Sequence, residues 1–99
     1  MCIAVDPGAI DAALSAAVGD DPALIAELRA AFRDSARRGL AAIESAQDDA
    51  AWQAAAWRLK GLAASFGAVR LAALATEAAR KPAGDALMVK QLRQMIARL

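Results

Sequence analysis

A tryptophan, a lysine and a glycine within five consecutive residues form the most distinctive group of side chains in the chain: Trp57, Lys60 and Gly61. In a helix, successive residues turn by about 100°, so residues three or four positions apart share a face. The face centred on Trp57 also contains Gln53 and Ala64. An indole beside an amine and very small residues is suited to docking another protein, because aromatic anchors are enriched at interfaces.

Gly61 requires an explanation of its own, because glycine inside a helix costs about 0.5–1 kcal/mol relative to alanine. Alanine is the residue that this sequence uses at most small positions. One explanation is close approach by another protein; the alternative is tight packing against another helix of the same chain. Gly61 lies opposite the apolar stripe of its own segment, which favours the docking explanation.

The chain has few groups that could catalyse a reaction or hold a metal. It contains no histidine, and Cys2 is its single cysteine. No glycine-rich phosphate loop precedes a predicted helix. We therefore expect no catalytic residue, no metal site and no cofactor, and we do not expect an enzyme.

Other charged groups have simple structural interpretations. The aspartate pairs at 20–21 and 48–49 stand at predicted helix starts, where capping and the helix dipole explain them better than calcium binding or catalysis. Four arginines follow one predicted helix: Arg29, Arg33, Arg37 and Arg38. A solvated helix face is the simplest interpretation, and a second surface for an acidic partner is the alternative.

Composition predicts an all-helical fold. The chain has 99 residues, of which 59% are hydrophobic and 23% charged, and alanine and leucine dominate. This composition favours helix over strand, and the length suits a single domain over residues 1–99. Capping residues and helix breakers delimit five predicted helices: from Pro7 to Gly19, about 22–46, from Asp48 or Asp49 to Gly67, 68–81, and from Asp85 to the end.

Each predicted helix carries one apolar stripe. In the third, Leu59, Leu62 and Phe66 should line the core, and Trp52 should point inward near the helix start. In the second, the stripe follows Leu24, Leu28, Phe32, Ser35, Gly39 and Ile43. Short connections make neighbouring helices antiparallel. We therefore predict an antiparallel up-and-down four-helix bundle with a short extra N-terminal helix laid across it.

Charge and hydropathy give no sign of nucleic acid or membrane as partners. Twelve basic and eleven acidic residues leave a formal charge of +1. The opening residues lack the pattern of a signal peptide, and no stretch is long and apolar enough to span a bilayer. We expect a cytoplasmic protein with a reduced Cys2, and the sequence implies no particular oligomeric state.

The segment around Trp57 resembles a known family. Its sequence, Ala-Trp-Arg-Leu-Lys-Gly-Leu-Ala-Ala-Ser-Phe-Gly-Ala over residues 56–68, is similar to the signature of histidine-containing phosphotransfer (HPt) domains. In that signature a histidine is followed after one residue by Leu-Lys-Gly, then by small residues and Gly-Ala. Residues 19–24, Phe32, Leu71, Leu74 and Glu77 resemble the neighbouring helices of the family, so the resemblance covers most of the chain.

The departure from the family lies at the reactive position, where Trp57 replaces the phosphoacceptor histidine that the resemblance implies. A phosphorelay histidine is a nucleophile with a free nitrogen lone pair. Indole has only an N–H donor, and the cationic side chains of Arg58 and Lys60 offer no lone pair at neutral pH. The resemblance also implies that the counterpart of Lys60 lies near the phosphoryl group and that the counterpart of Gly61 allows a receiver domain to approach.

The sequence therefore predicts a non-catalytic HPt-like module whose partner is a response-regulator receiver domain, a sensor histidine kinase, or both. The expected docking residues are Gln53, Trp57, Arg58, Lys60, Gly61 and Ala64. One alternative is a structural or self-associating helical bundle without a phosphorelay partner. Another is an ordinary phosphotransfer protein altered at Trp57.

Overall fold

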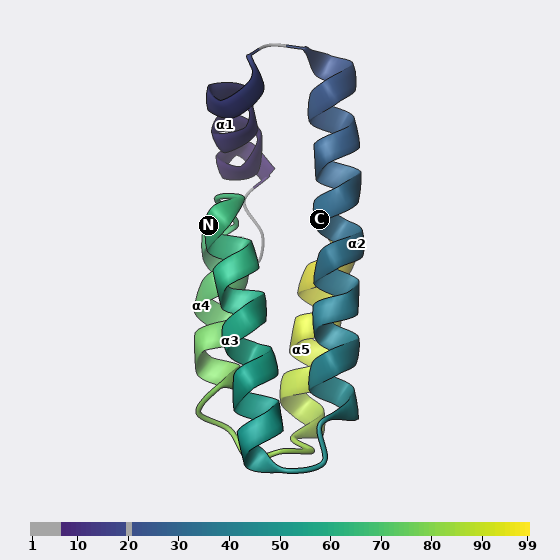
Figure 1. The fold of residues 1–99 in the computed structure, drawn as a ribbon, viewed down its shortest axis with the longest axis vertical. Helices are drawn as coiled ribbons and strands as arrows, with labels where there is room; N and C mark the ends of the chain where they lie inside the picture. Colours follow the sequence, from purple (N-terminus) through teal and green to yellow (C-terminus); the bar gives the residue numbers. More distant parts are fainter. Residues whose placement is uncertain (1–6, 20) are drawn as a thin grey trace.

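The computed structural model describes residues 7–19 and 21–99, with side chains from residue 12 onward in the first helix, and these residues form five α-helices and no strand. The helices are α1 (Pro7–Val18), α2 (Pro22–Ser45), α3 (Asp49–Ser65), α4 (Val69–Ala78) and α5 (Ala86–Ala97). Helices α2 to α5 run up and down as an antiparallel bundle, as predicted (Figure 1). The predictions made for Cys2 and Asp20 concern residues outside the described part of the chain.

The N-terminal helix does not lie across the bundle, so this part of the prediction is wrong. Helix α1 lies alongside the first half of α2 (Figure 1). The reason is the unequal length of the helices: α2 has 24 residues and α4 only 10. At a rise of 1.5 Å per residue α2 is about 36 Å long, so it extends beyond the bundle. The turn at Gly19 then folds α1 back along this extension.

Aspartate side chains cap three of the helices at the predicted positions. Asp21 accepts hydrogen bonds from the Ala23 and Leu24 backbone N–H groups at the start of α2. Asp48 caps α3, and Asp85 caps α5. These carboxylates satisfy N–H groups that have no partner inside the helix, so the capping interpretation of Asp21 and Asp48 is confirmed.

Helix α4 ends at Ala78, three residues before the predicted Lys81. The Arg80 and Lys81 N–H groups bond to the Glu77 and Ala78 carbonyls in tighter i to i+3 turns, each at 3.0 Å. Pro82 disfavours helical backbone at Lys81, the residue before it. Regular α-helix therefore ends at Ala78, two residues earlier than the effect of Pro82 on Lys81 would require.

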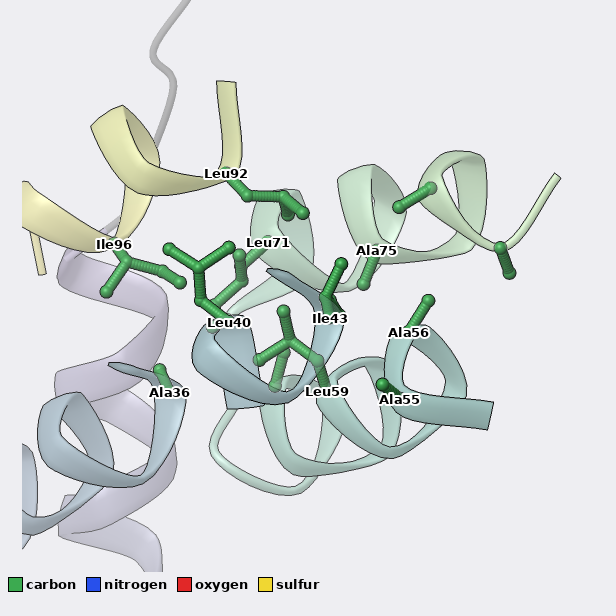
Figure 2. Close-up of a cluster of buried hydrophobic side chains, with 14 of the residues drawn as sticks. Ala36, Leu40, Ile43, Ala55, Ala56, Leu59, Leu71, Ala75, Leu92 and Ile96 are labelled. Carbon is green, nitrogen blue, oxygen red and sulfur yellow. The ribbon is translucent and has the colours of Figure 1, made fainter. Parts of the chain in front are cut away.

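The core is built from leucine, isoleucine and alanine side chains of α2 to α5 around two large aromatic residues. Trp52, Phe32 and Leu59 are each 1% exposed, which confirms the inward position predicted for Trp52 and Leu59. Figure 2 shows one part of this core, with Leu40, Ile43, Leu59, Leu71 and Leu92 pointing toward one another.

The predicted stripes are only partly correct. Leu62 and Phe66 are half-buried, although both pack against the core, and the Phe66 ring stacks on Phe32 with centroids 4.7 Å apart. Leu24 is 37% exposed and lies in the first turn of α2. On α2 the fully buried positions also include Ala36.

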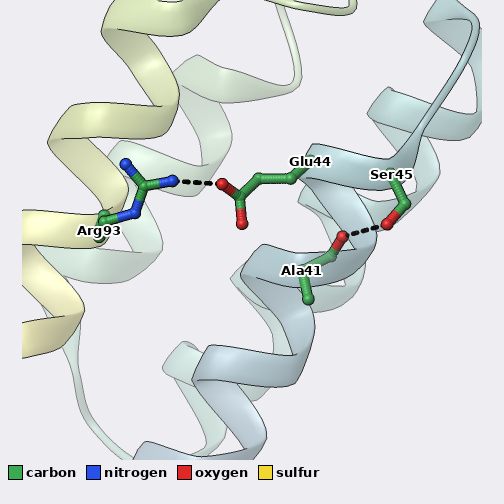
Figure 3. A network of polar contacts seen from close by, with 4 residues as sticks. All are labelled: Ala41, Glu44, Ser45 and Arg93. Carbon is green, nitrogen blue, oxygen red and sulfur yellow. Dashed lines mark hydrogen bonds and ion pairs between the residues drawn. The ribbon is translucent and has the colours of Figure 1, made fainter.

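Apart from the buried bond from the Trp52 indole N–H to the Ala78 carbonyl, polar contacts between helices in the described residues are few and lie at or near the surface. Arg93 of α5 pairs with Glu44 of α2, and the neighbouring Ser45 hydroxyl donates to the Ala41 carbonyl at 2.7 Å (Figure 3). Exposed ion pairs of this kind contribute about 0–1 kcal/mol. Apolar packing therefore holds the bundle together. None of the described helices is long and apolar enough to cross a bilayer.

Candidate functional site

Core packing fixes which face of α3 is turned outward. Trp52, Ala55, Leu59 and Ala63 are at most 2% exposed and form one helical stripe. Gly39 of α2 brings the two helices close together, because a Cβ at that position would lie 3.2 Å from Leu59 Cδ1. The opposite face of α3 is therefore presented to solvent.

Trp57 lies on this outward face with its side chain 46% exposed, although its neighbour Ala56 is fully buried. The Lys60 ammonium sits over the indole ring, 5.2 Å from its centroid. Cation–π contacts of this type are worth about 0.5–1 kcal/mol at exposed sites. The two side chains thus form a single aromatic and cationic feature on the surface.

Gly61 is exposed next to this pair. A Cβ added at Gly61 would meet no heavy atom within 4 Å, in contrast to the tight contact at Gly39. No helix in the described part of the chain packs against this position, so internal packing does not account for the glycine. Its carbonyl accepts a hydrogen bond from the Ser65 hydroxyl at 2.9 Å, which a Cβ would not disturb.

The remaining predicted docking residues are also exposed: Gln53, Arg58 and Ala64. Gln53 and Ala64 share the Trp57 face, whereas Arg58 is turned by about 100° from it. The structure thus brings together Gln53, Trp57, Lys60, Gly61 and Ala64 on one side of α3. We call these five residues the Trp57 face.

Gln53 also borders a surface groove that the sequence did not predict. The groove has a volume of about 520 Å³ and lies where α3 begins and α4 ends. Its lining residues are Asp49, Ala50, Gln53, Ala79, Arg80, Lys81 and Pro82. A sequence signal existed in the Arg80-Lys81-Pro82 run after α4, but only the fold brings it beside α3.

The site offers no metal-binding cluster and no nucleophile. No group of three His, Cys, Asp or Glu side chains in the described residues is placed to hold a metal ion. The Asp49 carboxylate accepts a hydrogen bond from the Ala83 N–H at 2.8 Å, and Asp48 caps α3. On the Trp57 face itself, no side chain can accept a phosphoryl group.

The α2 arginines do not form a uniformly solvated face. Arg29 donates to the Leu99 carbonyl at 3.5 Å, and Arg38 donates to the Ser35 hydroxyl at 3.1 Å. Arg37 lies 3.7 Å from the Asp34 carboxylate, and Arg33 is half-buried. Most of these side chains therefore have partners within the chain itself.

Comparison with known proteins agrees with the fold and with the Leu-Lys-Gly and Phe-Gly-Ala motifs. A family model described as Hpt domain matches residues 11–99. No curated protein and no solved structure matches the chain significantly. The matched region includes all of α2 to α5 and the Trp57 face. The chain therefore belongs to the Hpt domain family, whose members take part in phosphorelay signalling with response regulators and kinases.

Proposed function

We propose that this protein is a non-catalytic member of the Hpt family that binds a response-regulator receiver domain, or the sensor kinase of the same pathway, through the Trp57 face. In this role it occupies a partner without exchanging phosphate and competes with a phosphate-carrying HPt domain. Its place of action would be the cytoplasm, where it would meet a cytoplasmic receiver domain.

The observation that carries this proposal is the combination of an exposed indole, a lysine held over it and an open glycine beside it. Trp57 is 46% exposed, which is unusual for a side chain this large in a chain with a well-packed core. Lys60 is positioned by the ring, 5.2 Å from its centroid. Gly61 leaves open space where any other residue would place a side chain.

These features match the requirements of docking to an acidic pocket. The resemblance to HPt domains aligns Trp57 with the phosphoacceptor, so the face would approach the aspartate that a receiver domain uses for phosphorylation. The Lys60 ammonium can make a charge-assisted contact with that carboxylate. The indole can bury apolar area at the centre of the contact, where interface hot spots concentrate. Phosphoryl transfer cannot follow, because indole has no free lone pair.

Binding measurements with Trp57→Ala test this proposal. Receiver domains of the source organism would be titrated against the parent protein and the variant by isothermal titration calorimetry. Loss of an aromatic anchor should weaken binding by about 2 kcal/mol or more, roughly thirtyfold in affinity. The matched control is Leu87→Ala, which removes another exposed apolar side chain, 65% exposed, from α5.

The control should bind like the parent protein. Equal binding by Trp57→Ala and the parent would contradict the proposed interface. A parent protein that binds no receiver domain and no sensor kinase, but associates with itself, would instead support the structural alternative.

A further inference from the structure

The groove at the junction of α3 and α4 has a basic wall. Arg80 and Lys81 line it from the turn that follows α4, and both side chains are exposed. Asp49 is the one carboxylate among the lining residues, and its Oδ1 accepts a hydrogen bond from the Ala83 N–H. Neither Arg80 nor Lys81 has a salt bridge or side-chain hydrogen bond within the described part of the chain.

The backbone around the groove is held in place from both sides. The Trp52 indole N–H donates to the Ala78 carbonyl at 2.7 Å inside the protein, which ties the end of α4 to the start of α3. The bond from Ala83 N–H to Asp49 closes the loop after Pro82 onto the same helix start. The two cationic side chains therefore project from a fixed support.

The groove is continuous with the Trp57 face through a shared residue. Gln53 lines the groove and lies one turn before Trp57 on α3, about 6 Å along the helix axis. A protein that covers Trp57 and extends toward the start of α3 would therefore reach a basic groove.

We propose that this groove binds an acidic segment of the same receiver domain that docks on the Trp57 face, with Arg80 and Lys81 as the cationic contacts. This inference rests on the proposed function and adds a second contact region to it. Complementary charge of this kind fixes the orientation of a partner and speeds its encounter, because it acts before the apolar contact forms. The two regions together distinguish acidic receivers from others that offer only an aspartate pocket.

Charge reversal at the groove tests the proposal. The receiver domain of the source organism that binds the parent protein most tightly would be titrated against Arg80→Glu/Lys81→Glu by calorimetry at low and high salt. Like charges placed opposite an acidic segment should weaken binding about tenfold at low salt and flatten its salt dependence. Arg80→Gln/Lys81→Gln removes the charge without reversing it and should weaken binding about threefold.

The matched control is Lys90→Glu/Arg98→Glu, which changes the net charge equally at exposed positions of α5 and of the residue after it. This control should stay within about twofold of the parent, because long-range charge effects are screened. Circular dichroism and thermal melting would establish that each variant is folded. If the reversed variant lost its fold, the glutamine variant would still decide the outcome.

Different results separate the two proposals. If the groove variants bind like the control while Trp57→Ala loses affinity, the groove proposal is wrong and the proposed function stands. If the parent protein binds no receiver domain, the groove proposal is wrong, and if it also binds no sensor kinase, the proposed function is wrong as well. If the parent protein forms a dimer that charge reversal dissociates, the groove contacts a second copy of the chain, and the receiver assignment is overturned.

Discussion

Substituting Gly61 by alanine should stabilise the protein while weakening its proposed contact with a receiver. Gly61 lies in the interior of α3, and an added Cβ would meet no heavy atom within 4 Å. Alanine there would therefore gain the usual helix preference over glycine, about 0.5–1 kcal/mol, without a steric cost. For a domain of this size, that gain corresponds to a rise in melting temperature of roughly 2–8 °C.

Chemical denaturation of Gly61→Ala followed by circular dichroism measures the change directly. The matched control is Ala64→Gly, three residues further along α3 on the same exposed face. This variant should have a free energy of unfolding lower than that of the parent by about the same amount. Gly39→Ala gives a contrasting case, because its Cβ would lie 3.2 Å from the buried Leu59 side chain and offset the gain.

Destabilisation by Gly61→Ala would refute the open environment assigned to this residue. In receiver titrations the same variant should bind more weakly than the parent protein, because its methyl group occupies the space through which the partner approaches. Unchanged or stronger binding by Gly61→Ala, together with higher stability, would mean that the glycine serves no docking role.

Two further substitutions test the packing that orients the site. Leu59→Ala should lower the free energy of unfolding by about 2–5 kcal/mol in urea titrations, because Leu59 is 1% exposed and its loss leaves a cavity beside Gly39. If Leu59→Ala melted like the parent while Trp57→Ala unfolded the protein, the two faces of α3 would be assigned the wrong way round. Trp52→Phe should cost about 0.5–1.5 kcal/mol from the lost hydrogen bond, because it removes the indole N–H that the Ala78 carbonyl accepts in addition to the Lys81 N–H. Trp57→Phe is its control and should change stability by no more than about 0.5 kcal/mol, so equal losses in the two variants would contradict the role given to the Trp52 bond.

The elements that the sequence predicts well are those marked by local chemistry. Asp21 and Asp48 mark helix starts because a carboxylate can accept hydrogen bonds from the free backbone N–H groups there. This interaction is local and does not depend on the rest of the fold. Gly67 ends α3 with φ of 75°, a conformation that glycine adopts without strain. The outward position of Trp57 follows from helical periodicity alone, since it depends only on where the apolar stripe of α3 lies.

The features that the sequence missed depend on contacts between distant segments. Helix α4 ends early because the chain tightens into i to i+3 turns before Pro82, and the Trp52 indole N–H bonds the Ala78 carbonyl at this end. The groove forms because this contact brings Arg80 and Lys81 next to Gln53, 27 and 28 residues away along the chain. The cation–π contact joins Lys60 to Trp57, and periodicity placed them on one face without fixing the side-chain positions.

Phosphotransfer to Trp57→His tests the central claim most directly, because this claim is that the protein keeps the docking face and lacks only the nucleophile. The variant places an imidazole beside Lys60 and Gly61 on an exposed face, where a substitution usually changes stability by no more than about 0.5 kcal/mol. Phosphorylated receiver domains of the source organism, carrying labelled phosphate, would be incubated with the parent protein, Trp57→Ala and Trp57→His. We predict acid-labile phosphate on Trp57→His alone, as the phosphoryl group passes from the receiver aspartate to an imidazole nitrogen. Transfer to the parent protein, or a folded Trp57→His that neither binds nor exchanges phosphate with any receiver, would contradict the account.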